Sequence, residues 1–195
     1  MKDVVVLAGP NGAGKTTAAH ELVPDRLAIR EFVNADDIAR GLSPFNPEGA
    51  AVAAGRLMIE RMRGLAGAGQ SFAFETTCAG RAHLGFLERC KKDGWRVSLV
   101  YLWLPSPDAA LARVAKRIRQ GGHRVPPHVV VRRYWAGLVN MFNLYLPAAN
   151  IVAIYDNSDQ ERVLIAERTV DTALRVIDGT RWAAIERAAN DRSDG

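Results

Sequence analysis

Near its amino end the chain reads Gly9-Pro10-Asn11-Gly12-Ala13-Gly14-Lys15-Thr16, directly after the apolar run of residues 4–8. The pattern G-x-x-x-x-G-K-T between a predicted strand and a predicted helix is the phosphate-binding P-loop. Its glycines let successive backbone N–H groups turn toward a phosphate, and the following helix adds the positive end of its dipole. The stretch therefore predicts a strand, a glycine loop and a helix that together hold a nucleotide.

The motif also predicts the cofactors and the residues that bind them. We expect ATP, with Lys15 reaching the β- and γ-phosphates and the hydroxyl of Thr16 ligating Mg²⁺. A glycine turn without function would explain the glycines, but not a lysine and a threonine at this spacing. The residues expected to contact the nucleotide are Gly9, Pro10, Asn11, Gly12, Ala13, Gly14, Lys15, Thr16 and Thr17.

The composition is that of a globular chain, with 195 residues of which 48% are hydrophobic and 24% charged. No apolar run approaches the roughly 20 residues that cross a membrane, so no membrane partner is expected. Cys78 and Cys90 lack metal-binding or C-x-x-C spacing, and no signal-peptide pattern precedes the first strand. We expect a cytoplasmic protein with one P-loop domain over residues 1–190 and a frayed tail at 191–195.

Short apolar runs alternate with helical patterns along the chain. This alternation predicts an α/β fold, a three-layer αβα sandwich of the P-loop NTPase type with a mostly parallel sheet of five to six strands. Strands are predicted at 4–8, 29–33, 71–74, 97–104 and 151–155, with an edge strand at 163–166. Helices are predicted at 14–22, 48–66, 81–92, 107–120, 127–146 and 180–189.

Polar clusters follow three of the predicted strands, where ligands bind in open α/β sheets. They are Asn34-Ala35-Asp36-Asp37, Glu75-Thr76-Thr77 and Asp156-Asn157-Ser158, and we expect them to converge on the P-loop. Each of these clusters would also fit a helix cap or a turn without a role in binding. For Asp156-Asn157-Ser158, an Asx turn explains the residues fully.

Asp36 stands where a carboxylate can orient and deprotonate an acceptor hydroxyl, with Asn34 beside it as a substrate contact. Glu75 ends an apolar strand as a Walker-B acid does, which predicts an outer contact to Mg²⁺ or a contact to substrate. Thr76 and Thr77 are predicted to bind substrate through their hydroxyls.

Positive charge is concentrated in residues 109–155, which contain no Asp or Glu, whereas the rest of the chain has more acidic than basic residues. A basic surface that merely faces solvent would normally carry acidic residues among the basic ones. Two predicted helices joined at Gly121-Gly122 carry this charge, so we predict a lid over residues 107–146 that closes over ATP. The basic residues of the segment are Arg113, Lys116, Arg117, Arg119, Arg124, Arg132 and Arg133.

The ordered set of motifs resembles the zeta-toxin-like family of small P-loop kinases over roughly residues 3–160. The motifs are GPNGAGKTT at 9–17, FVNAD at 32–36, FETT at 74–77, GGHRVP at 121–126 with RRY at 132–134, and YDNS at 155–158. The resemblance implies a kinase that transfers the γ-phosphoryl group of ATP to a hydroxyl of a sugar nucleotide similar to UDP-N-acetylglucosamine. It also implies the toxin of a toxin–antitoxin pair, with an antitoxin protein as partner.

The resemblance assigns residues to roles. The catalytic aspartate corresponds to Asp36, the P-loop lysine to Lys15, and the substrate-side Glu-x-Thr to Glu75 and Thr77. The lid arginines correspond to Arg117 and to Arg124 or a neighbouring arginine. Thr76 departs from the Glu-Gly-Thr type of sequence in the larger zeta toxins, and this bears on sugar-nucleotide specificity more than on kinase chemistry.

Two other functional classes remain open. A nucleoside or nucleic-acid kinase would share Lys15 and Asp36 and would use the basic segment to grip an acceptor phosphate. An ABC-type ATPase switch shares the glycine loop, but this sequence has no LSGGQ-like signature and no long strand ending in Asp-Glu. Only Arg133-Tyr134-Trp135 interleaves basic and aromatic residues as single-strand-binding grooves do. The expected partners are therefore ATP and a hydroxyl-bearing, phosphate-containing small molecule rather than nucleic acid.

Overall fold

The computed structural model describes residues 2–23, 28–121 and 125–192. Within these ranges, seven strands form one sheet in the order β2-β3-β1-β4-β5-β6-β7. The first five strands are parallel, and β6 and β7 are antiparallel to their neighbours. The strands are β1 Asp3–Ala8, β2 Glu31–Val33, β3 Phe72–Thr76, β4 Arg96–Trp103, β5 Ile151–Asp156, β6 Val163–Arg168 and β7 Arg175–Val176.

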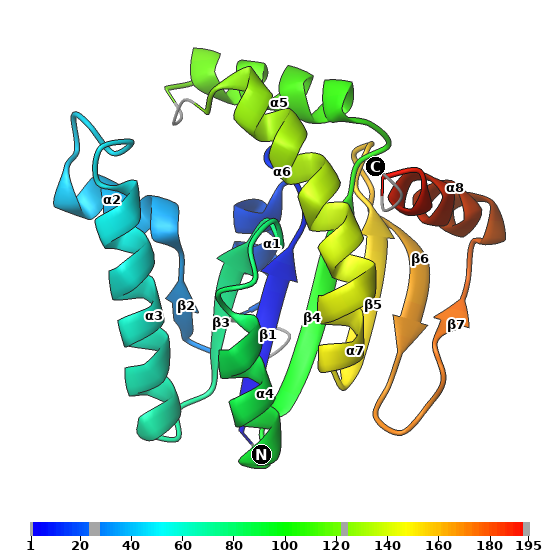
Figure 1. Ribbon diagram of the computed structural model, residues 1–195, viewed down its shortest axis with the longest axis horizontal. Helices are drawn as coiled ribbons and strands as arrows, with labels where there is room; N and C mark the ends of the chain where they lie inside the picture. The colour runs from blue at the N-terminus through cyan, green and yellow to red at the C-terminus, as the bar shows by residue number, and fades with distance from the viewer. Residues whose placement is uncertain (1, 24–27, 122–124, 193–195) are drawn as a thin grey trace.

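Helices cover both faces of this sheet (Figure 1). They are α1 Lys15–Leu22, α2 Ala35–Leu42, α3 Ala51–Gly67, α4 Leu84–Lys92, α5 Pro107–Arg119, α6 Pro127–Asn140, α7 Leu146–Ala148 and α8 Gly179–Asn190, with a π-helical segment η1 Met141–Tyr145 between α6 and α7. The predicted α/β class with a mostly parallel sheet is confirmed. In the described part of the chain the sheet has seven strands, however, and not five to six.

The alternation of side chains along β1 explains the layers. Val4 and Val6 point into the larger core, which is shared with α3, α4, α6 and α8, whereas Val5 and Leu7 point into a smaller cluster beneath α1. A strand with both faces buried reads as a continuous apolar run, as this one does. The run of five apolar residues before the P-loop therefore marks a strand in the middle of the sheet.

Several elements differ from the sequence expectations, among them α2, β3 and β7. The short helix α2 was not predicted, because its apolar stripe of Ala35, Ile38, Ala39 and Leu42 spans only eight residues and only Ala39 among them is buried. The strand β3 extends to Thr76 instead of ending at residue 74, which puts Glu75 inside the sheet. The two residues of β7 are both exposed, so they carry no burial pattern to detect.

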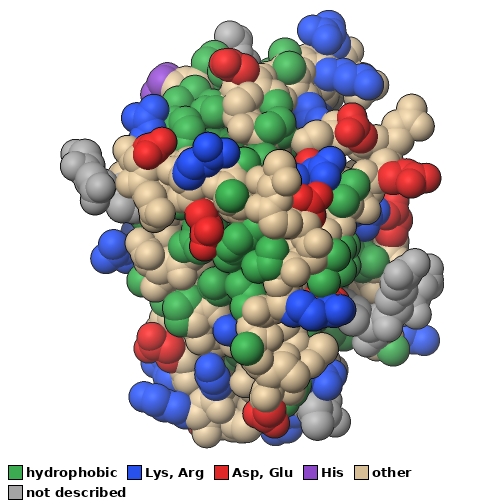
Figure 2. Space-filling model, turned by 90° about the vertical axis from the view of Figure 1, so that its right-hand side faces the viewer, with side chains coloured by type: hydrophobic (Ala, Val, Ile, Leu, Met, Phe, Trp, Pro, Cys, Tyr) green, Lys and Arg blue, Asp and Glu red, His purple; other side chains and the backbone are tan. Residues whose placement is uncertain are grey.

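The edge of the sheet at β7 lies far from the P-loop in the strand order. Figure 2 shows this side of the molecule, with hydrophobic side chains gathered near its centre and charged side chains of both signs around them. Val163, Val176 and Ile177 are among the exposed apolar residues of this region. In the described part of the chain, no helix is long and apolar enough to cross a membrane.

Candidate active site

The glycine loop turns sharply between β1 and α1 and passes close to other backbone. Gly9 has a φ of +137°, and a Cβ atom there would lie 2.3 Å from the carbonyl oxygen of Leu102 in β4. Gly12 and Gly14 also have positive φ. From the other side, Asn157 donates through Nδ2 to the carbonyl oxygen of Ala13 at 2.7 Å. The loop is thus held between β4 and the segment after β5, with α1 starting at Lys15.

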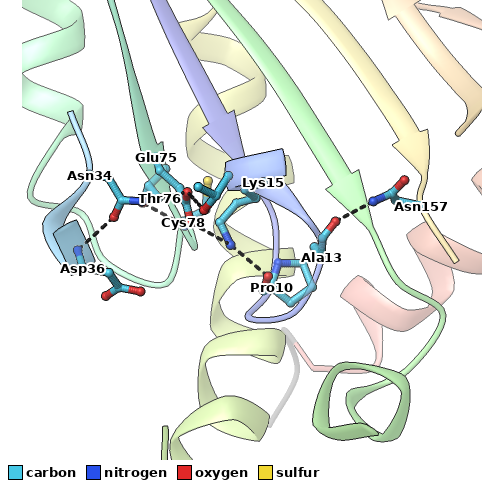
Figure 3. Close-up of polar contacts among 10 residues, drawn as sticks. Pro10, Ala13, Lys15, Asn34, Asp36, Glu75, Thr76, Cys78 and Asn157 are labelled. Atoms are coloured by element: carbon cyan, nitrogen blue, oxygen red, sulfur yellow. Dashed lines mark hydrogen bonds and ion pairs between the residues drawn. The ribbon is translucent and has the colours of Figure 1, made fainter. Parts of the chain in front are cut away.

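Lys15 is almost completely buried, with 5% of its surface exposed. Its Nζ donates to the carbonyl oxygen of Pro10 at 2.9 Å and lies 3.5 Å from Oε1 of Glu75 (Figure 3). A buried ammonium group needs an opposite charge and hydrogen-bond acceptors, and these two residues supply both. The lysine is therefore held beside the glycine loop, at the head of α1.

Glu75 joins three elements. Its Oε2 accepts hydrogen bonds from Thr16 Oγ1 at 2.7 Å and from Asn34 Nδ2 at 3.1 Å. The parallel pairing of β1 with β3 sets Leu7 opposite Glu75 and Ala8 opposite Thr76, so this carboxylate stands beside the start of the glycine loop. Glu75 is a strand residue that links the P-loop helix to the end of β2, and it caps no helix.

Asp36 and Asp37 are adjacent in the first turn of α2, but their carboxylates have different surroundings. The side chain of Asn34 caps this helix by accepting from the backbone N–H of Asp36 at 2.8 Å. The Asp36 carboxylate lines the cavity in front of the P-loop and has no side-chain partner among the described residues (Figure 3). Asp37 is exposed and pairs with Arg40. Of the two carboxylates, Asp36 is therefore the one available to a ligand.

A cavity of about 750 Å³ extends from the glycine loop across to α3, α5, α6 and the segment before α4. Lys15, Asp36, Thr76 and Thr77 all line it, so the structure brings the P-loop and the first two polar clusters together. Four arginines line it as well: Arg56 from α3, Arg117 from α5, and Arg132 and Arg133 from α6. A cavity of this size is typical of small-molecule sites.

Arginines of α3 and α6 differ in their pairing with carboxylates. In α3, Arg61 pairs with Glu31, whereas Arg56, Arg132 and Arg133 pair with no carboxylate in the described ranges. Their charge is thus available to an acidic ligand. The sequence had not singled out Arg56, because an arginine in an amphipathic helix normally marks its solvent face.

The pKa of His83, which lines the far wall of the cavity, is lowered by burial, so the imidazole is uncharged at neutral pH. Cys78, fully buried beside Thr77, has a pKa raised by burial, with Lys15 acting weakly in the opposite direction. A thiol that stays protonated is a poor nucleophile. His83 therefore adds neutral surface to the cavity, whereas Cys78 stays buried outside its lining as a neutral thiol.

The third polar cluster supports the P-loop from behind. Asp156 Oδ1 accepts from the backbone N–H of Ser158 at 2.9 Å, which is the expected Asx turn, and its Oδ2 accepts from Arg181. Arg113 in turn donates to the carbonyl oxygen of Ser158. Only Asn157 reaches the glycine loop, so this cluster does not join the other two in the cavity. Arg124 lies outside the described residues.

The fold and the glycine loop together define a P-loop NTPase-like α/β domain. A family model described as AAA domain (AAA_33) matches residues 4–134, more than half of the chain. The protein belongs to this family. A relative in the bacterium Haemophilus influenzae, described as an uncharacterized protein, is 28% identical over 130 residues, which cover 67% of this chain and 91% of that protein.

Two solved structures show the same fold. AvrRxo1-ORF1 in its complex with AvrRxo1-ORF2 has a TM-score of 0.76 at 18% identity, covering 95% of this chain and 63% of that one. The chain thus spans less than two thirds of AvrRxo1-ORF1, whose complex has also been solved with ATP. The PezAT toxin–antitoxin system of Streptococcus pneumoniae gives a TM-score of 0.62 at 14% identity, with 100% and 88% covered. The resemblance to zeta-toxin-like proteins is confirmed at the level of the fold.

Proposed function

We propose that this protein is an ATP-dependent small-molecule kinase that transfers the γ-phosphoryl group of ATP to a hydroxyl of an acidic acceptor. The observation that carries the proposal is one cavity lined by both Lys15 and Asp36. A phosphate-binding lysine and an unpaired carboxylate facing the same space are what phosphoryl transfer to a hydroxyl requires. The existence of an AvrRxo1 complex with ATP supports ATP as the donor.

In this proposal each side chain of the site has one task. The backbone N–H groups of the glycine loop and the Lys15 ammonium bind the β- and γ-phosphates. Asp36 orients the acceptor hydroxyl and takes its proton, while the hydroxyl oxygen bonds to the γ-phosphorus. The bond from that phosphorus to the bridging oxygen breaks, and ADP leaves. Asn34, Glu75, Thr76 and Thr77 line or support the acceptor side.

The oxygen donors beside Lys15 fit Mg²⁺. Thr16 Oγ1 and the Glu75 carboxylate lie next to one another, and Mg²⁺ prefers oxygen ligands supplied by few protein groups together with phosphates. Thr16 would hold the ion directly, with Glu75 orienting the threonine hydroxyl. When bound, Mg²⁺ neutralises charge on the β- and γ-phosphates.

The acceptor we favour is a sugar nucleotide similar to UDP-N-acetylglucosamine, since Arg56, Arg132 and Arg133 suit an acceptor that carries phosphates. A nucleoside or nucleic-acid kinase and an ATPase switch without acceptor are the alternatives. The likeness to a toxin–antitoxin system supports an antitoxin protein as a further partner.

The deciding experiment is a transfer assay with radiolabelled ATP and three acceptor classes: UDP-sugars, nucleosides and oligonucleotide ends. Label on UDP-N-acetylglucosamine supports the proposal in full. Label on nucleosides or oligonucleotides would instead identify the protein as a nucleoside or nucleic-acid kinase. Hydrolysis of ATP with no labelled acceptor indicates the switch.

The variant Arg56→Gln is expected to raise the acceptor KM about tenfold or more and to leave the ATP KM unchanged, because a hydrogen bond to a charged group contributes about 1.5–3 kcal/mol. The measurement is steady-state transfer kinetics with each substrate varied in turn. Arg63→Gln is the matched control, since it removes the same charge from the same helix at an exposed position outside the cavity wall. Equal effects of the two substitutions would argue against an acceptor contact at Arg56.

The lid proposed for residues 107–146 brings Arg117 of α5 to the cavity. Arg117→Ala is expected to lower kcat at least about tenfold while raising the ATP KM less, because a contact made chiefly in the transition state appears in kcat. Arg119→Ala, at an exposed position two residues further along the same helix, is the control. A rise in the ATP KM without a loss of kcat would instead make Arg117 a ground-state nucleotide contact.

A further inference from the structure

The segment of residues 77–80, which continues from Thr76 along the cavity wall, lies directly against helix α6. A Cβ atom on Gly137 would lie 2.2 Å from the carbonyl oxygen of Thr77, a distance that real Cβ atoms essentially never show. The backbones of α6 and of this segment can therefore touch only because residue 137 has no side chain. Glycine within a helix lowers the free energy of unfolding by about 0.5–1 kcal/mol relative to alanine. The contact between α6 and residue 77 therefore requires a residue that is less favourable for the helix itself.

Two side-chain hydrogen bonds hold the same segment. Asn140, near the end of α6, donates through Nδ2 to the carbonyl oxygen of Cys78 at 2.8 Å. Tyr145, at the end of η1, donates through its hydroxyl to the carbonyl oxygen of Gly80 at 2.8 Å. Burial raises the pKa of Tyr145, so its hydroxyl remains a donor. Gly137, Asn140 and Tyr145 thus form a loop clamp on residues 77–80.

The clamped segment has an unusual backbone that the clamp helps to maintain. Cys78 has a φ of +57°, in the left-handed region that costs a side-chain-bearing residue about 1–2 kcal/mol. Its N–H donates to Thr76 Oγ1 at 3.1 Å, which fixes the threonine side chain at the cavity wall. The π-helical turn η1 directly follows Asn140. Such turns are rare in proteins, and those that occur are often found at functional sites.

The other end of α6 carries the arginines of the cavity. Arg133 precedes Gly137 by four residues, so both lie on one face of the helix. Arg133 and Ala136 line the same cavity as Thr76 and Thr77. One rigid helix therefore connects a free positive charge to the clamped segment.

We propose that Gly137, Asn140 and Tyr145 are positioning residues that lock residues 77–80 onto α6, so that Thr76, Thr77 and Arg133 form one preset acceptor-binding wall. The role of this wall in binding an acceptor rests on the proposed kinase function. The clamp also makes α6 a fixed part of the site, which excludes α6 from the moving part of the proposed lid.

The test compares Asn140→Ala and Tyr145→Phe with the wild-type chain. Asn143→Ala is the matched control, because Asn143 is exposed on the same helical run. Hydrogen–deuterium exchange of a peptide covering residues 76–83 is expected to be about five- to tenfold faster in the two clamp variants, as for the loss of one hydrogen bond. Exchange in residues 9–17 and the affinity for a fluorescent ATP analogue are expected to match wild type.

Transfer kinetics separate positioning from a loss of folded protein. With UDP-N-acetylglucosamine, or the acceptor labelled in the screen, the acceptor KM is expected to rise at least about fivefold in Asn140→Ala and Tyr145→Phe, with the ATP KM unchanged. A purely structural role would lower the active fraction and therefore kcat, and would leave both KM values alone.

Unchanged exchange of residues 76–83 in both variants overturns the clamp. Faster exchange with equal changes in the two KM values overturns the acceptor wall. If the wild-type chain labels no acceptor at all, the proposed function fails, and the exchange measurement by itself decides whether α6 locks this segment.

Discussion

Lys15→Ala is expected to abolish phosphoryl transfer, with a fall in kcat/KM of at least about 10³-fold, and to leave the fold intact. The ammonium is the buried positive charge beside the glycine loop, 5% exposed, and its removal takes away the group that follows the γ-phosphate into the transition state. The fold is expected to survive because Glu75, the carboxylate left behind, also accepts hydrogen bonds from Thr16 and Asn34. Transfer of label from ATP, together with circular dichroism and thermal unfolding, measures both parts of this result.

The matched control is Lys116→Ala, which removes the same charge from an exposed position on α5. It is expected to keep wild-type kinetics. Retained transfer in a folded Lys15→Ala protein would disprove the assignment of the glycine loop as the phosphate site, and with it the kinase proposal.

The part of the site that the sequence could predict is local in the chain. β1, the glycine loop and α1 are consecutive, and Lys15 follows Gly14 directly, so the order of residues alone specifies their geometry. Asn34 and Asp36 were also accessible, because a polar pair after a predicted parallel strand falls at the carboxyl edge of the sheet. The sequence alone could not show how the neighbouring Asp37 differs from Asp36. In the structure, Asp37 pairs with Arg40.

The rest of the site depends on contacts between distant segments. Arg56 and Gly137 look like ordinary residues of amphipathic helices, and only the packing of α3 and α6 around the cavity gives the first a free charge and the second a close backbone neighbour. The sequence also predicted one helix over residues 127–146. The structure divides this span into α6, η1 and α7, because the π-helical turn directs Tyr145 to the carbonyl oxygen of Gly80, a contact 65 residues away in the chain.

The choice of base is tested by Asp36→Asn. This substitution preserves the shape of the side chain but removes its ability to take a proton, so transfer is expected to fall at least about 10²-fold, the lower end of general-base effects. ATP affinity should stay near wild type, because the phosphates are held by the glycine loop and Lys15 and not by Asp36. The capping contact is kept as well, since Asn34 accepts from the backbone N–H of residue 36 and not from its side chain.

Asp37→Asn is the control for Asp36→Asn, because the two substitutions remove the same charge from adjacent positions of α2. Asp37 is 49% exposed and pairs with Arg40, so its loss is expected to leave kcat within about twofold of wild type, as for most exposed ion pairs. Single-turnover transfer and ATP binding by calorimetry, run on both variants, separate chemistry from affinity. If Asp37→Asn were the slow variant, the base would be Asp37. If neither substitution slowed transfer, no carboxylate at the start of α2 would act on the acceptor. A kinase would then need another general base to deprotonate the acceptor hydroxyl, whereas an ATPase switch would need none.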